Sequence, residues 1–123
     1  MSEENNLDKF GKFLVENLRD KGISHAEFLL NNRWKSPALQ NIQHELSYLS
    51  FSQKETVKKA IISTIDSAIH DFLFALQEQA DFDNEIQIIV NEDNIVELSD
   101  GIHGEAYSDD GWYAKYSKYE TIE

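Results

Sequence analysis

The chain has 123 residues and a formal net charge of −12 at pH 7, with 41% hydrophobic and 28% charged residues, which is typical of one globular domain. This acidity argues against nucleic acid and anionic membranes as partners, because both are bound through clustered Lys and Arg. The lack of cysteine, of a long apolar run and of a basic leader predicts a cytoplasmic protein without a membrane span.

Residues 7–21 are predicted to form the first amphipathic helix. Its apolar stripe consists of Phe10, Phe13, Leu14 and Leu18. Gly22 is expected to end this helix, because glycine readily takes the left-handed conformation of a helix terminus. Ser24 and Glu27 have the spacing of a capping box, which predicts a second helix from there to about Arg33.

Two further helices are expected before residue 80. Ser36 and Pro37 suit a helix start, so a third helix is predicted to run from there to about residue 50. Ser52 and Glu55 repeat the capping-box pattern and open the longest helix, over residues 53–79. Its apolar positions are Val57, Ile61, Ile62, Ile65, Ala68, Ile69, Phe72, Leu73 and Leu76.

The apolar period changes to two after Ala80, which is typical of strands. Residues 86–90 and 95–98 flank a polar turn and predict one hairpin. Residues 105–108 and 112–117 flank Asp109-Asp110-Gly111 and predict a second hairpin. A loose tail is expected over residues 119–123.

These elements predict a single α+β domain over residues 1–123. The helical part covers about 7–79 and the β-rich acidic part about 85–118. Four N-terminal helices would pack on a C-terminal antiparallel sheet of three or four strands, since a sheet needs a cover on one face.

Catalytic and metal-binding patterns are weak. Asp66 and His70 can meet on one helix face, but no glycine-rich or strained turn that could supply an oxyanion hole adjoins them. His103 and Glu105 lack the cysteines or paired histidines of a zinc site, and the loop that starts at Asp81 lacks the glycine of a calcium-binding EF-hand. The sequence therefore predicts no enzyme, no cofactor and no metal.

The acidic charge is concentrated in the C-terminal third. Residues 81–123 hold 12 acids against Lys115 and Lys118, whereas residues 1–80 hold 11 acids and 9 bases. The acidic part is also rich in aromatic residues, and such a mixture favours protein binding, because aromatic side chains supply affinity while charges raise the encounter rate. The candidate partner-binding residues are Asp93, Glu97, Asp100, Glu105, Tyr107, Asp109, Asp110, Trp112, Tyr113 and Tyr116. A merely solubilising surface, with about half of the aromatics in the core, is the alternative.

The segments Asp100–Glu105 and Asp109–Tyr116, with the small size and the lack of cysteine, resemble at the level of class the small acidic immunity proteins with which bacteria neutralise toxins. This resemblance implies a stoichiometric inhibitor that covers a basic toxin domain, such as that of a nuclease. It specifies no fold. The alternative function is a small cytoplasmic regulatory or scaffolding module that forms a homodimer.

Overall fold

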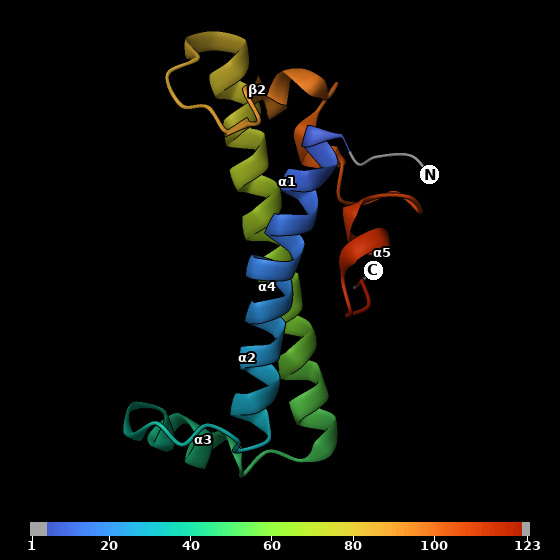
Figure 1. Ribbon diagram of the computed structural model, residues 1–123. Coiled ribbons are helices and arrows are strands. Elements are labelled where there is room, and N and C mark those ends of the chain that lie inside the picture. The colour runs from blue at the N-terminus through green and yellow to red at the C-terminus, as the bar shows by residue number, and fades with distance from the viewer. Residues whose placement is uncertain (1–4, 122–123) are drawn as a thin grey trace.

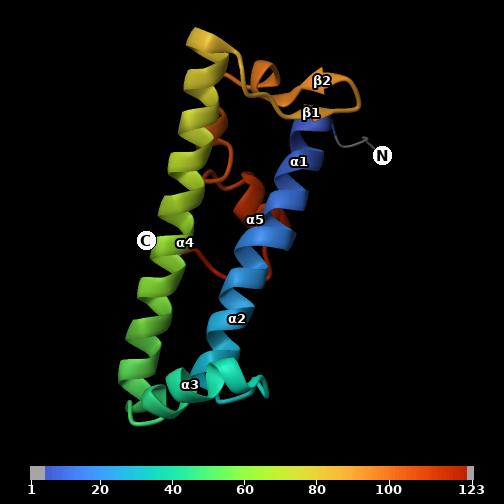
Figure 2. The same ribbon diagram turned by 90° about the vertical axis from the view of Figure 1, so that its left-hand side faces the viewer.

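The computed structural model describes residues 5–121, which form two long antiparallel helical segments with a C-terminal segment laid along one side (Figures 1 and 2). The elements are α1 (Asn6–Leu14), a π-helical turn (Val15–Arg19), α2 (Asp20–Leu30), a 3-10 turn (Pro37–Leu39), α3 (Gln40–Leu46), α4 (Phe51–Glu78), a π-helical turn (Gln79–Asp83), β1 (Ile89–Val90), β2 (Asp93–Asn94), 3-10 turns (Ile95–Leu98 and Ile102–Gly104) and α5 (Trp112–Tyr116). No helix in this range is long and apolar enough to cross a bilayer.

The first long segment is one continuous helix whose buried face shifts at the π-helical turn Val15–Arg19. Leu14 is buried, and the regular α-helical period would bury Leu18 next. The π-helical turn contains one extra residue, so Leu18 is 50% exposed and Arg19 is fully buried. The buried face then continues from Arg19 through Ile23.

The predicted break at Gly22 is wrong, because α2 runs through this position. A Cβ atom at residue 22 would lie 2.9 Å from Cδ1 of Ile65, so the glycine permits close packing between α2 and α4. Ser24 and Glu27 form no capping box. Their side chains bind the C-terminal segment, where the Tyr119 hydroxyl lies 2.7 Å from Ser24 Oγ and 3.0 Å from Glu27 Oε1.

The connection between the long segments contains the predicted third helix in a shorter form. Pro37 opens it as a 3-10 turn, and α3 ends at Leu46. Gln43 is buried and bonds the backbone of Trp34 twice, accepting from its N–H and donating to its carbonyl at 2.9 Å each. These two bonds fold the connection back across the end of the helical pair.

The cap of α4 lies two residues before the predicted one. The Ser50 hydroxyl accepts from the backbone N–H of Gln53 at 3.1 Å, and the Gln53 side chain accepts from the Ser50 N–H at 2.8 Å. This reciprocal pair is a complete capping box. The helix therefore starts at Phe51 rather than Gln53.

Replacing Ser50 with alanine is expected to lower the free energy of unfolding by about 1 kcal/mol, because the backbone N–H of Gln53 loses its acceptor. Urea denaturation monitored by circular dichroism measures this loss. Ser52→Ala is the control, since Ser52 is exposed and is not the cap. An equal loss in both variants would contradict the assignment of the cap to Ser50.

The hydrophobic core lies where the upper halves of the two long segments meet the C-terminal segment. On α4, the buried positions Ile69, Leu73 and Leu76 belong to this core. The C-terminal segment covers the pair with Ile95, Val96, Ile102, Ala106, Trp112 and Tyr113. The C-terminal third is thus a cover for the helices.

The predicted α+β fold with three or four strands is wrong. The described residues contain a single hairpin of two-residue strands, in which Ile89 pairs with Asn94 and Val90 with Asp93. Ile95 and Val96 are both buried, which a strand with alternating sides does not allow. A 3-10 turn, capped by the Asn94 side chain, places both in the core instead.

The predicted second hairpin is also wrong, because Trp112–Tyr116 forms α5. Trp112 and Tyr113 are neighbours in sequence and are both buried, again excluding a strand. The two predicted segments do meet, through hydrogen bonds from the N–H of Trp112 to Glu105 O and from that of Tyr113 to Ala106 O. The contact between residues 105–108 and 112–117 was therefore predicted, but the helical conformation of Trp112–Tyr116 was not.

Candidate binding surface

Arg19 occupies the centre of a buried polar network between the two long segments. Its Nε lies 2.6 Å from Asp66 Oδ1 and its Nη2 3.2 Å from Asp66 Oδ2, a two-point ion pair between the first helix and α4. The guanidinium carbon is 4.3 Å from the ring centroid of Tyr113. A fully buried arginine is tolerated here because its charge is paired and its donors are bonded.

The same arginine fastens the C-terminal segment to the helices. Nη1 donates to Ser117 Oγ at 2.8 Å and to the Tyr119 carbonyl at 3.4 Å, while Nη2 donates to the Glu120 carbonyl at 3.1 Å. The predicted loose tail is therefore wrong for residues 119 and 120. Residues 122 and 123 lie outside the described part of the chain.

Carboxylates of α2 hold this segment from the other side. Asp20 is buried and accepts from Ser117 Oγ at 2.6 Å and from the Lys118 N–H at 3.1 Å. Glu27 forms an ion pair with Lys58 at 2.7 Å, and this hydrogen bond lowers the pKa of Glu27 and raises the pKa of Lys58. Both groups remain charged at neutral pH, which keeps α2 and α4 paired beside the tail.

Removing the Ser117 hydroxyl is expected to cost about 2 kcal/mol of unfolding free energy, because buried groups on Arg19 and Asp20 each lose a partner. Ser117→Ala and wild type are compared by urea denaturation. The matched control is Ser108→Ala, whose exposed hydroxyl bonds only to the exposed Asp110. A loss in Ser117→Ala no larger than in the control would contradict the role of this network.

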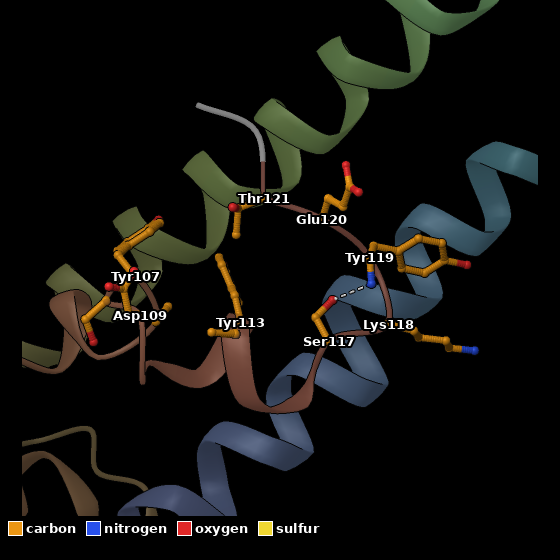
Figure 3. Close-up of a pocket in the computed structure, with 11 residues that line it drawn as sticks. Tyr107, Asp109, Tyr113, Ser117, Lys118, Tyr119, Glu120 and Thr121 are labelled. Atoms are coloured by element: carbon orange, nitrogen blue, oxygen red, sulfur yellow. Dashed lines mark hydrogen bonds between the residues drawn. The ribbon is translucent and has the colours of Figure 1, made fainter.

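A hollow of about 430 Å³ lies between the loop at Tyr107 and the segment 117–121, with Tyr113 at its floor (Figure 3). The Tyr113 hydroxyl is buried and has no hydrogen-bond partner among the described residues. Burial raises the pKa of Tyr113 far above its usual range and also raises the pKa of Tyr107. Both phenols are therefore protonated at neutral pH, and the Tyr107 hydroxyl donates to the Asp66 carbonyl at 3.4 Å.

The ten sequence-predicted binding residues do not form one surface. Trp112 and Tyr113 lie in the core, at 1% and 2% exposure, so neither is available as a surface anchor. Tyr116 and Glu105 are half-buried, whereas Tyr107 is 49% exposed. The other acids are exposed in two groups: Asp93, Glu97 and Asp100 lie beyond the end of α1, and Asp109 and Asp110 lie in the loop before α5.

The Asp66 and His70 pair weighed as a catalytic site is not formed. Asp66 binds Arg19, while His70 Nδ1 lies 3.2 Å from Asp71 Oδ1. The His70 ring stands at 86° to that of His103, with 5.5 Å between centroids. No group of three or more His, Asp or Glu side chains that could hold a metal gathers within residues 5–121.

The strongest concentration of charge lies at one end of the molecule, in residues 78–105, called here the acidic end (Figures 1 and 2). This stretch holds nine acids and no Lys or Arg. Four apolar side chains are exposed among the acids: Phe82 at 80%, Ile86 at 61%, Ile89 at 53% and Leu98 at 47%.

Sequence reasoning missed these four side chains. Ile86 and Ile89 were assigned to a sheet covered by helices, and Phe82 and Leu98 were given no binding role. The charge count alone could have identified the stretch, because no Lys or Arg occurs between Lys59 and Lys115 and the acids become dense from Glu78 onward.

Comparisons of the chain with protein-family models, with curated proteins and with solved structures found no match.

Proposed function

We propose that this protein is a stoichiometric protein-binding inhibitor of the immunity type, which covers a basic surface of a toxin domain with its acidic end. The observation that carries the proposal is the run of nine carboxylates without a Lys or Arg around four exposed apolar side chains. Carboxylates speed the encounter with a basic surface, and apolar side chains slow dissociation once they are desolvated.

The apolar contacts of the proposed interface differ from those expected from sequence. Trp112 was the expected anchor but is buried. Phe82 and Ile86 are exposed and take the role of anchors in the proposed interface. Exposed apolar side chains rimmed by charged residues are typical of protein-binding sites. A nuclease fits as the partner, because a cleft that binds phosphates also attracts a dense group of carboxylates. The lack of cysteine is consistent with a cytoplasmic location.

The test compares two triple variants of equal net charge. Glu85→Gln, Glu92→Gln and Glu97→Gln remove three exposed charges from the acidic end, whereas Glu16→Gln, Glu45→Gln and Glu55→Gln remove three elsewhere. Wild-type protein is first used to capture its partner from the native host, and the partner is identified. The association rate of this partner is then measured with wild type and with each triple variant. We expect an association rate about tenfold slower in the first variant and little change in the second.

Inhibition is then titrated with the recovered partner. One equivalent of wild type is expected to abolish the activity of the partner, and co-expression is expected to rescue cells from it. Equal association rates in both triple variants would refute the role of the acidic end. Binding without inhibition would refute the inhibitor and leave the regulatory or scaffolding module.

A further inference from the structure

We propose that copies of this protein associate end to end, with the exposed apolar side chains of the acidic end of one copy seated on the opposite end of the next. The opposite end consists of residues 31–59, around α3 and the start of α4, and is called here the basic end. This association is separate from the inhibitor function, because it requires the basic end as well.

The two ends carry opposite charge. Residues 31–59 hold five bases and two acids, whereas residues 78–105 hold nine acids and no bases. The part of α4 between residues 59 and 78 separates them by about 28 Å, several times the screening length of about 8 Å in physiological salt. Neither end can therefore neutralise the other within one molecule, and only contact between molecules brings the opposite charges together.

The most exposed large apolar side chains among residues 5–121 lie at the same two ends. Phe51 is 81% and Tyr48 76% exposed at the basic end, and Phe82 is 80% exposed at the acidic end. Such exposure is costly in water and is relieved when the side chains are buried against one another. The apolar side chains and the charges thus favour the same contact.

The basic end also has a hollow that suits an apolar side chain. About 240 Å³ of space lies between the end of α2 and the start of α4, with Leu30 and Phe51 on its walls and with Lys54, Lys58, Glu27 and Glu55 around them. Phe82 projects from a π-helical turn surrounded by Asp81 and Asp83. Insertion of Phe82 would bring these two carboxylates toward Lys54, since Lys58 is already paired with Glu27.

This contact joins two different surfaces, so it does not close on itself by two-fold symmetry. A pair of copies joined in this way still has one free acidic end and one free basic end. Further copies can therefore add at both ends of the pair. Two acidic ends repel each other, which disfavours the symmetric alternative through that surface. The expected product is a series of oligomers rather than a fixed dimer.

The test uses one variant blocked at each end. Phe82→Ser with Glu85→Lys changes the acidic end, and Phe51→Ser with Lys54→Glu changes the basic end. Circular dichroism and thermal unfolding confirm that each variant is folded, which is expected because the four side chains are partly or largely exposed. Sedimentation at physiological ionic strength then measures mass against concentration.

Wild type is expected to grow beyond the mass of a dimer as its concentration rises. Each blocked variant alone is expected to stay monomeric. An equimolar mixture of the two should form a dimer that does not grow, because the mixture offers one intact acidic end to one intact basic end. Tyr107→Ser, which changes a half-exposed aromatic residue outside both ends, should associate as wild type does.

Three results would overturn the proposal: a wild type that is monomeric at all concentrations, growth that stops at the dimer, or a mixture that associates no more than its components. The variant blocked at the basic end keeps the acidic end intact. Loss of its self-association with unchanged binding of a basic partner therefore separates this proposal from the proposed function.

Discussion

Replacing Arg19 with methionine is expected to lower the free energy of unfolding by about 3 to 5 kcal/mol, because the partly buried Asp66 then loses its counter-charge. Ser117 and the carbonyls of Tyr119 and Glu120 lose donors in the same variant. The midpoint of urea denaturation should fall while the slope stays that of wild type, since the surface exposed on unfolding is almost unchanged.

Two companion variants identify the cause of this loss. Arg33→Met removes an exposed arginine that lies over the Phe28 ring at 4.7 Å, and is expected to cost less than about 1 kcal/mol. Asp66→Leu combined with Arg19→Met should recover part of the loss, because the carboxylate that Arg19 neutralised is then also removed. A loss below about 1 kcal/mol in Arg19→Met would show that the ion pair does not hold the C-terminal segment.

Adding a single methyl group at Gly11 is expected to destabilise the protein by about 3 kcal/mol. A Cβ atom there would overlap the indole ring of Trp112, which is 1% exposed and packed directly on the α1 backbone. Relief requires displacement of the indole, whose Nε1 donates to Asp8 at 3.3 Å and which packs against the Phe10 ring at an interplanar angle of 76°. Thermal unfolding of Gly11→Ala measures the loss.

Gly104→Ala is the control, because nothing lies within 4 Å of a Cβ atom added at that position. Its unfolding free energy should stay within about 0.5 kcal/mol of wild type. Trp112→Phe in the Gly11→Ala background should cost less than it does in wild type, since a smaller ring leaves room for the methyl group. Additive losses would contradict a direct clash between the two residues.

The helical part of the fold could be predicted because its signals are local. The apolar period and proline at position 37 placed the third and fourth helices, and α4 occupies Phe51–Glu78 where residues 53–79 were predicted. The prediction at Gly22 was wrong because this glycine lets α2 pack closely against Ile65, a residue 43 positions further along the chain. No local pattern distinguishes a glycine that ends a helix from one that admits a neighbouring helix.

The C-terminal part could not be predicted, because its conformation depends on the groove that it covers. Ile95, Val96, Trp112 and Tyr113 have strand-forming side chains, yet each adjacent pair is buried on one side against the helices. Packing against the helices also determines which of the candidate binding residues are exposed. The acids could be counted from the sequence, but the burial of Trp112 followed from a glycine about a hundred positions earlier.

The π-helical turn Val15–Arg19 also bears on how distant relatives of this chain would be aligned. A relative with a regular α-helix in this place would lack one of the five residues, so its sequence would match on both sides only with a single-residue gap. Without that gap, the exposed Leu18 would be compared with the position of the buried Arg19. Alignments that allow an insertion inside this helix are therefore better suited to finding such relatives.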